Sequence, residues 1–245
     1  MKAIILAAGI GKRLWPQTAD CPKSLLQFRG KSLLERMLTA LERADVREVV
    51  IVVGYLRHQI VEAVARSGTR LSVRYVENPR YQKGSLLSLW RARTELDQDL
   101  LILDADVLCP STLLSRLVHS DHENAVLLDP RAVPSGEEMM VAARQGRVWH
   151  IGRRVPGMWD IVGESVGFYK FTEEAARRLR QSVEFCFQRG KVHVDYEHAL
   201  LSVFPECVVG YELVGDTPWI EIDTPADVKR AEREIIPQLL AEEGR

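Results

Sequence analysis

Cysteine is scarce in this sequence, and the few cysteines stand far apart. The four among 245 residues form no C-x-x-C pair and no Cys/His cluster with metal-ligand spacing; they are Cys21, Cys109, Cys186 and Cys207. This pattern supplies no zinc motif and no disulfide framework, and it favours reduced thiols in the cytoplasm. We therefore expect all four cysteines to be structural.

A surplus of charge and a long apolar run are also missing. The formal net charge is −1 at pH 7, which gives no general attraction to nucleic acid or to anionic membranes. No apolar stretch approaches the roughly 20 residues of a membrane span, and the first residues lack the pattern of a signal peptide. We expect a cytoplasmic protein with small-molecule partners, no nucleic acid partner and no membrane span, and a homodimer remains open.

The composition otherwise supports a globular protein with a sizeable core, since 46% of the residues are hydrophobic and 27% are charged. In the first 110 residues, buried-strand patterns alternate with amphipathic-helix patterns. The strands are expected at Lys2–Leu6, Val49–Val53, Leu71–Val76 and Leu100–Leu103, and the helices after Ser32, over Arg57–Arg66 and from Gly84. This alternation predicts a parallel sheet covered by helices, with ligands at the carboxyl ends of the strands.

Beyond Pro110 the pattern changes to shorter and more varied elements. We expect strands at Ala125–Leu128, Met139–Ala143, Arg147–Ile151, Glu164–Phe171, Val208–Val214 and Trp219–Ile222. The expected helices run to about His119, over Glu173–Gln188 and from a point after Thr224-Pro225. A loop is expected at Pro134-Ser135-Gly136 and a hairpin turn at Gln145-Gly146. We predict one α/β domain over residues 1–245, with a Rossmann-like, mixed but mostly parallel sheet and helices on both faces. Residues 1–110 would form a nucleotide-binding half, and residues 111–245 an insertion-rich acceptor-binding half.

The first strand runs directly into a glycine loop in the stretch KAIILAAGIGKRLWPQTADCPK, residues 2–23. Small residues let the backbone turn tightly and direct its N–H groups at an anion. Lys12, Arg13 and Lys23 add positive charge to the same stretch, so the arrangement suits a triphosphate. A dinucleotide fingerprint is excluded because Leu14 replaces its third glycine, and a Walker loop is excluded because Leu6 replaces its first.

Carboxylates mark two strand ends that lie far apart in the sequence. Asp104-Ala105-Asp106 follows the fourth strand, and Trp219-Ile220-Glu221-Ile222-Asp223 precedes the last helix. Hard divalent ions such as Mg²⁺ prefer carboxylate and phosphate oxygens. Each pattern alone is also typical of loop or helix-cap residues, and Asp223 in particular could cap the last helix.

Together these stretches resemble the signature of the nucleotidyltransferases that act on sugar phosphates and phospho-alcohols. The matching elements are LAAGxGxRL and the following PK, a DxD-like element, and a closing (D/E)-I-D-(T/S) element. The resemblance is nearest to the cytidylyltransferases for phosphocholine, inositol 1-phosphate and aminoethylphosphonate. It implies that Arg13 and Lys23 are catalytic, that Asp106 and Asp223 bind Mg²⁺, and that Asp104 supports them.

The resemblance also implies a nucleotide site around the first strand. Its predicted members are Leu6, Ala7, Ala8, Gly9, Gly11, Lys12, Tyr55, Gly84, Ser85 and Asp104. Three of these have open alternatives: Lys12 as a solvated surface residue, Tyr55 as a surface tyrosine, and Ser85 as a helix cap.

The acceptor site is expected in the second half of the chain, where aromatic and acidic residues recur. Glu164, Tyr169, Asp195 and Glu197 are the predicted acceptor-binding residues, with Trp149, Trp159 and Tyr196 nearby. Such a pocket attracts an ammonium group, whereas a neutral polyol phosphate requires hydrogen bonds to its hydroxyls. The aromatics could instead be core residues, and Asp195 and Glu197 could cap a short helix.

The resulting functional prediction is a CTP-dependent cytidylyltransferase that joins CMP to a small phosphorylated alcohol or phosphonate and releases pyrophosphate. One departure concerns choline, because Leu86-Leu87-Ser88-Leu89-Trp90 replaces the Asn-rich stretch of phosphocholine enzymes. Two alternatives remain open: a sugar-1-phosphate nucleotidylyltransferase that uses UTP, dTTP or GTP, and a non-catalytic domain that senses nucleotides.

Overall fold

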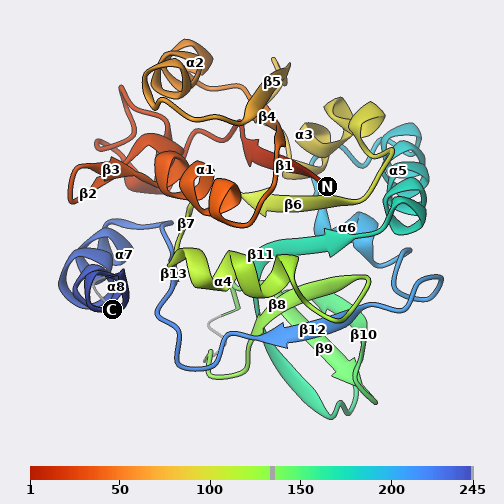
Figure 1. The fold of residues 1–245 in the computed structure, drawn as a ribbon. Coiled ribbons are helices and arrows are strands. Elements are labelled where there is room, and N and C mark those ends of the chain that lie inside the picture. The colour runs from red at the N-terminus through yellow and green to blue at the C-terminus, as the bar shows by residue number, and fades with distance from the viewer. Residues whose placement is uncertain (133–135, 244–245) are drawn as a thin grey trace.

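The computed structural model describes residues 1–132 and 136–243 and is built around a nine-stranded mixed sheet (Figure 1). Its parallel part has the order β5–β4–β1–β6, from the strands β1 (Lys2–Ala7), β4 (Glu48–Val53), β5 (Ser72–Glu77) and β6 (Leu100–Asp104). In β1, Ile4 packs into the core on one face, and its neighbours Ala3 and Ile5 pack on the other. Burial on both faces explains why β1, β4 and β6 are nearly continuous apolar runs, whereas β5 at the edge of the sheet carries exposed polar residues.

The second part of the sheet is organised by the long strand β11 (Ile161–Phe171). Its first half pairs antiparallel with β9 (Met140–Arg144), and its second half pairs antiparallel with β6. The remaining strands extend this part of the sheet: β8 (Ala125–Asp129) beside β11, β12 (Gly210–Leu213) beside β8, and β10 (Arg147–Gly152) beside β9. β11 therefore joins the parallel strands to the inserted ones.

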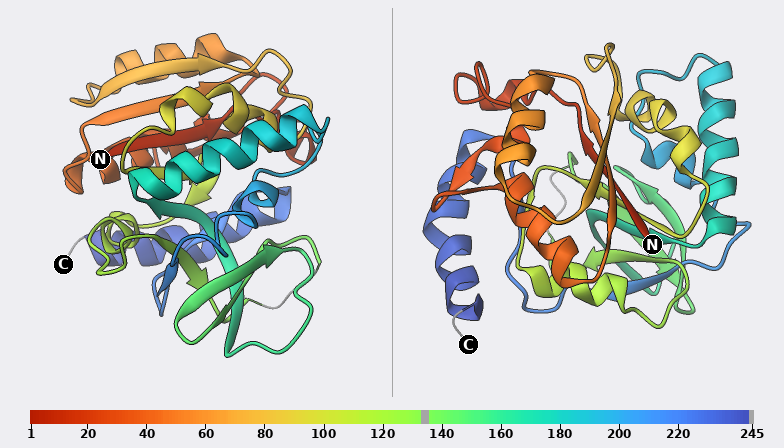
Figure 2. Two further views of the ribbon diagram at one scale, coloured as in Figure 1. Left: turned by 90° about the vertical axis from the view of Figure 1, so that its right-hand side faces the viewer. Right: turned by 45° about the horizontal axis from the view of Figure 1, so that its top comes forward.

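Helices cover both faces of the sheet, as Figure 2 shows from two further sides. The helices α1 (Leu33–Arg43), α2 (Arg57–Arg66) and α4 (Ser111–Val118) pack on one face, and α3 (Ser85–Arg91), α5 (Glu173–Gln188) and α6 (Glu197–Leu200) pack on the other. None of the helices in the described ranges has the length and apolar character to cross a membrane. The prediction of a mixed, mostly parallel sheet with helices on both faces is confirmed.

The C-terminal segment forms a third packed region outside the main sheet. Strand β13 (Ile220–Glu221) pairs with β7 (Val107–Leu108), and α7 (Pro225–Arg230) continues through a π turn, Ala231–Ile235, into α8 (Ile236–Glu243). This helix packs on the hairpin of β2 (Gln27–Phe28) and β3 (Lys31–Ser32), beside α1 (Figure 1).

The π turn has a local cause in Pro237. Proline has no N–H to donate to the carbonyl oxygen of Arg233 four residues earlier, and its ring would clash with that carbonyl in a regular α-helix. The wider turn at Ala231–Ile235 avoids the clash. Short 3-10 turns at Lys12–Leu14, Lys23–Leu25 and Arg93–Glu95 complete the described elements.

Most predicted elements are confirmed to within two residues, including the hairpin turn, where Gln145 and Gly146 have φ values of +53° and +72°. β11 is longer than predicted because it begins at Ile161 and pairs there with β9. β13 lies within the strand predicted at Trp219–Ile222, whereas the two-residue strands β2, β3 and β7 were not predicted, since so short a run has no periodicity of its own. Most of the predicted Pro134-Ser135-Gly136 loop lies outside the described residues, and the single domain with two halves stays a prediction.

The C-terminal helix offers a stability test with its own matched control. Leu239 is buried at 1% exposure, whereas its neighbour Leu240 is 47% exposed. We expect Leu239→Ala to lower the free energy of unfolding by about 2–4 kcal/mol, because it leaves a cavity in the packed region. Leu240→Ala should change it by less than about 0.5–1 kcal/mol. Urea denaturation measures both, and equal losses would contradict this docking of the helix.

Candidate active site

The glycine loop lies at the carboxyl end of β1, where the parallel strands end. Gly11 has φ of +68°, which favours glycine, and a Cβ there would lie 3.2 Å from the Cβ of Lys23. Thr18 donates from Oγ1 to the carbonyl oxygen of Gly11 at 2.8 Å and holds the turn. The loop therefore passes close to Lys23, and Gly9 has open space at the position of a side chain.

Lys23 is the most enclosed cation of the site, with 12% of its side chain exposed. Its Nζ donates to Asp106 Oδ2 at 2.7 Å and to Asp223 Oδ1. Burial alone would lower the pKa of Lys23, but the two carboxylates outweigh it and raise the pKa above its usual value. Lys23 is therefore a permanent positive charge.

Arg13 approaches the same aspartate from the other side. Its guanidinium donates to Asp223 Oδ2 at 2.6 Å and, through its other nitrogen, to Glu137 Oε2. Burial would favour the neutral form of Asp223, but Lys23 and Arg13 lower its pKa. The two predicted catalytic residues thus converge on one carboxylate that lies about 200 residues away in the sequence.

Asp106, Glu221 and Asp223 form a carboxylate cluster with oxygen atoms within 4.8 Å of one another. Asp106 Oδ1 is buried and has no hydrogen-bond partner. Burial, followed by the charges of Asp106 and Asp223, raises the pKa of Glu221 to about 9. Three oxygen donors with an unpartnered buried oxygen fit a hard divalent cation such as Mg²⁺.

A cavity of about 260 Å³ lies between the ends of β1 and β6. Because β4 flanks β1 on one side and β6 on the other, this is the switch point at which open α/β sheets bind ligands. Seven of the ten predicted nucleotide-binding residues line it: Leu6, Ala7, Ala8, Gly9, Gly84, Ser85 and Asp104. Lys23 and Asp106 also line it, so the cavity reaches the carboxylate cluster.

The start of α3 forms one wall of this cavity. Gly84 is the N-cap, and a Cβ there would clash with the backbone of His193 and Val194. Ser85 Oγ accepts from the backbone N–H of Tyr196 at 2.9 Å. The interpretation of Ser85 as a helix cap is therefore wrong, and its hydroxyl instead joins α3 to the segment before α6.

Asp104 and the remaining predicted nucleotide residues have distinct surroundings. Asp104 Oδ2 accepts from the hydroxyl of Tyr196 at 2.9 Å, and burial, followed by Glu197 and Asp106, raises its pKa. Tyr55 donates from its hydroxyl to the carbonyl oxygen of Ala19. Lys12 is exposed on the loop. The structure does not bring Gly11, Lys12 or Tyr55 to the wall of the 260 Å³ cavity.

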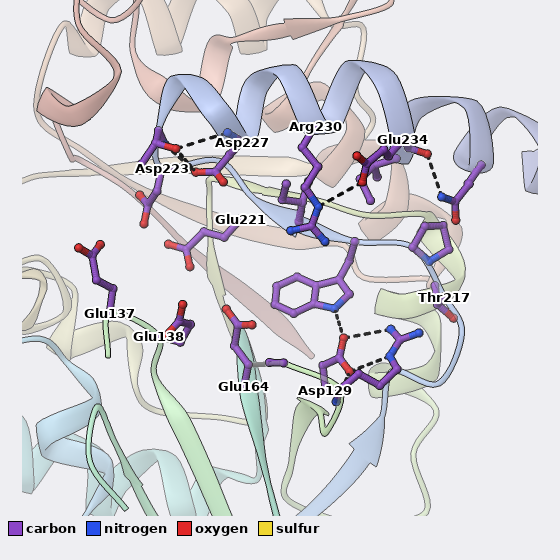
Figure 3. A pocket seen from close by; sticks show the side chains of 18 of the residues that line it. Asp129, Glu137, Glu138, Glu164, Thr217, Glu221, Asp223, Asp227, Arg230 and Glu234 are labelled. Carbon is purple, nitrogen blue, oxygen red and sulfur yellow. Dashed lines mark hydrogen bonds and ion pairs between the residues drawn. The ribbon is translucent and has the colours of Figure 1, made fainter. Parts of the chain in front are cut away.

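A second, larger cavity of about 770 Å³ lies between β11 and the C-terminal helix (Figure 3). Its lining carries nine carboxylates and three guanidinium groups: Asp129, Glu137, Glu138, Glu164, Asp216, Glu221, Asp223, Asp227 and Glu234, with Arg13, Arg131 and Arg230. Glu221 and Asp223 belong to the carboxylate cluster as well, so the two cavities meet there. The larger cavity is strongly acidic beside a phosphate-type loop.

Glu164 points into the larger cavity, opposite Glu221 (Figure 3). Its position on β11 is fixed by pairing with Met140 on β9 and Asp129 on β8. Burial, followed by the charges of Glu138 and Asp129, raises the pKa of Glu164 to about 7. Glu164 therefore changes charge near neutral pH.

The aromatic lining of this cavity comes from a residue that sequence reasoning missed. Trp219 is largely buried and donates from Nε1 to Asp129 Oδ2 at 2.8 Å, while Asp129 also accepts from Arg131 at 2.9 Å. The residue stands in the closing motif, which was interpreted for its acids alone. By contrast, the exposed Trp149 and the half-buried Trp159 stack with Arg147 and Arg144, respectively, and lie outside the cavity lining.

Three predicted acceptor residues do not line the larger cavity. Tyr169 is fully buried, and its hydroxyl pairs with Ser165 Oγ at 2.8 Å. Asp195 pairs with Arg153 at 3.0 Å. Glu197 is buried, with a pKa that burial raises to about 8. Asp195 and Glu197 do not cap the helix α6, because its N-cap residue is Tyr196 and the cap has no side-chain hydrogen bond.

The sequence is similar to proteins whose names state an activity. The chain is 28% identical, over 97% of its length, to CMP-5′-(3-aminopropyl)phosphonate synthase from Streptomyces rubellomurinus. It is 30% identical, over 96% of its length, to the bifunctional IPC transferase and DIPP synthase from Rubrobacter xylanophilus. The chain spans 39% of the length of the first relative and 52% of the second.

A solved structure has the same fold. CTP:phosphocholine cytidylyltransferase from Streptococcus pneumoniae superposes with a TM-score of 0.78 at 25% identity, covering 94% of this chain and 97% of that chain. The family described as MobA-like NTP transferase domain matches residues 3–151, which include the glycine loop, Lys23 and Asp106. This chain therefore belongs to the family of MobA-like NTP transferase domains.

Proposed function

We propose that this chain is a Mg²⁺-dependent cytidylyltransferase that joins CMP from CTP to a small phosphorylated alcohol or phosphonate bearing an ammonium group. The observation that carries the proposal is the acidic cavity of about 770 Å³, which adjoins Arg13 and the carboxylate cluster. Pyrophosphate is the second product. The partners of the chain are then a nucleoside triphosphate and the acceptor.

The charge of the cavity supports an ammonium-bearing acceptor. Several nearby carboxylates stabilise an ammonium group. The phosphate of an uncharged polyol would add negative charge to the site, and the polyol itself would bring no positive charge to offset the carboxylates. Trp219 supplies an aromatic side chain in the same lining as Glu164, and a cation is attracted to an aromatic face. These features favour phosphocholine-like or aminoalkylphosphonate acceptors over inositol 1-phosphate.

The names of two relatives support the same pairing of nucleotide and acceptor. The Streptomyces relative is named for a CMP-linked aminopropylphosphonate, and the pneumococcal structure is named for CTP and phosphocholine. Both acceptors carry a cationic nitrogen. The Rubrobacter relative is named for another activity. The proposal of an ammonium-bearing acceptor therefore depends on the cavity of this chain and not on membership of the family.

The chemistry follows from the charges of the site. An oxygen of the acceptor phosphate or phosphonate forms a bond to the α-phosphorus of CTP, and the bond from that phosphorus to the pyrophosphate oxygen breaks. The nucleophile is already an anion, so no general base is required. Lys23 and Arg13 orient the phosphates and offset their negative charge. Mg²⁺, held by Asp106, Asp223 and Glu221, would add further screening of that charge when bound.

A substrate matrix tests the proposal directly. We expect pyrophosphate release with CTP and an aminoalkylphosphonate or phosphocholine, and at least about tenfold lower kcat/KM when the amine is replaced by a methyl group. UTP, dTTP and GTP with hexose 1-phosphates serve as the comparison. Turnover of a hexose 1-phosphate with one of these nucleotides, and none with CTP, would assign the chain to the sugar-phosphate class.

The metal assignment predicts a loss in two separate measurements. Asp106→Asn and Asp223→Asn should each lower kcat at least about a hundredfold. Each substitution weakens the binding of Mg²⁺, whose positive charge offsets the negative charge of the phosphates. Mg²⁺ should raise the melting temperature of the wild type and not that of the variants. Asp121→Asn, at an exposed position after α4, is the control. An equal Mg²⁺ shift in Asp106→Asn would refute the assignment.

The raised pKa of Glu164 predicts a pH dependence of acceptor binding. Below a pKa of about 7 the carboxyl is neutral, and above it the negative charge attracts the ammonium group. KM for an aminoalkylphosphonate should therefore fall several-fold from about pH 6 to about pH 8. Because the phosphonate also titrates in this range, Glu164→Gln is the reference. Identical pH profiles for the wild type and this variant would exclude the role.

A further inference from the structure

Arg13 is shared between two acids, and only one of them belongs to the carboxylate cluster. Besides Asp223, its guanidinium pairs with Glu137, in the segment that leads into β9. Arg13 is 52% exposed and Glu137 68% exposed. The main chain of Glu137 is held in place separately, since its carbonyl oxygen accepts from Arg153 at 3.1 Å.

The Arg13–Glu137 pair is easily exchanged because both partners face solvent. Exposed ion pairs contribute little to stability, whereas a triphosphate offers an arginine several charged oxygens with a geometry that matches its donors. A nucleotide that binds beside the glycine loop therefore competes with Glu137 for Arg13. When the nucleotide wins, Glu137 loses its positive partner.

Glu137 lines the same acidic cavity as Glu164 and Glu221 (Figure 3). We propose that Glu137 is a specificity-determining residue that Arg13 neutralises in the free protein and that nucleotide binding releases to receive the ammonium group of the acceptor. This inference rests on the proposed function for its acceptor part. Its nucleotide part requires only that Arg13 contacts the triphosphate.

The exchange couples the two substrates. Before the nucleotide binds, the positive charge of Arg13 adjoins the acceptor cavity and opposes an ammonium group. Afterwards the same charge faces the triphosphate, and the carboxylate of Glu137 is available. Nucleotide and acceptor should therefore each raise the affinity for the other by the same factor, because binding free energies are linked reciprocally.

The variant Glu137→Gln separates this role from a structural one, because it should move two affinities in opposite directions. Without its competitor, Arg13 should bind CTP about two- to fivefold more tightly, the range expected for an exposed ion pair. KM for the aminoalkylphosphonate should rise about fivefold, with kcat little changed. Calorimetry with CTP alone gives the first value, and pyrophosphate release gives the second.

Two controls identify the partner. Glu234→Gln removes a charge from the same cavity at a residue paired with Arg230, and it should leave the affinity for CTP within about twofold of the wild type. In an Arg13→Gln background, Glu137→Gln should no longer tighten CTP binding, as a double-mutant cycle requires for a direct pair. Tighter CTP binding in that background would overturn the inference.

The remaining outcomes distinguish this inference from the proposed function. If the wild type releases no pyrophosphate with any ammonium-bearing acceptor, the proposed function fails, and calorimetry still decides the competition for Arg13. If CTP affinity does not rise in Glu137→Gln, the release of Glu137 is refuted even in an active cytidylyltransferase. If CTP affinity rises while KM for the amine is unchanged, Glu137 does not select the acceptor. Glu137→Asp keeps the charge and should give intermediate values.

Discussion

The ion pairs of Lys23 with Asp106 and Asp223 connect three segments that are remote in the sequence: the turn Lys23–Leu25 beside the glycine loop, the end of β6 and the start of the C-terminal helix. A largely buried lysine is tolerated only because two carboxylates offset its desolvation. The packed region under the C-terminal helix and the β7–β13 pair hold Asp223 in reach. The helix is thus part of the site's construction, since its first turn follows the residue that Lys23 and Arg13 share.

The same pairs suggest why the free protein tolerates so many like charges at one place. Lys23 and Arg13 partly neutralise the acids of the cluster, and desolvation together with the charges of Asp106 and Asp223 raises the pKa of Glu221. A nucleotide with its cation would bring the same two kinds of charge, so binding would exchange partners rather than create charges in a low-dielectric site. Preorganisation of this kind lowers the reorganisation that accompanies the reaction.

Much of the fold follows from local patterns, because β-branched apolar runs, capping boxes and glycine turns act over a few residues. Ser32 and Glu35, for example, form the expected capping box at the start of α1. Strand ends marked Asp106 and Asp223 as candidates, but that the two lie together was implied only by the resemblance to the nucleotidyltransferase signature. The positions of Trp219 and Glu137 in the larger cavity were not predicted. Trp219 is held by Asp129 and Glu137 by Arg13, and no sequence periodicity indicates either of these long-range contacts. Tyr169 shows the converse: an aromatic near an acidic strand start can simply fill the core.

The two cavities share no lining residue and both adjoin the carboxylate cluster, so the base and the acceptor of the proposed reaction would contact different parts of the chain. The smaller cavity is lined by β1, β6 and the start of α3, whereas the larger is lined by β11, the segment before β9 and the C-terminal helix. Substitutions at Glu137 or Glu164 would therefore change the charge of the larger cavity, and substitution of Trp219 would change its aromatic surface, while Lys23 lines the other cavity. The glycine loop by itself therefore does not determine the acceptor, and under the proposed function the charge of the larger cavity would select it in this chain.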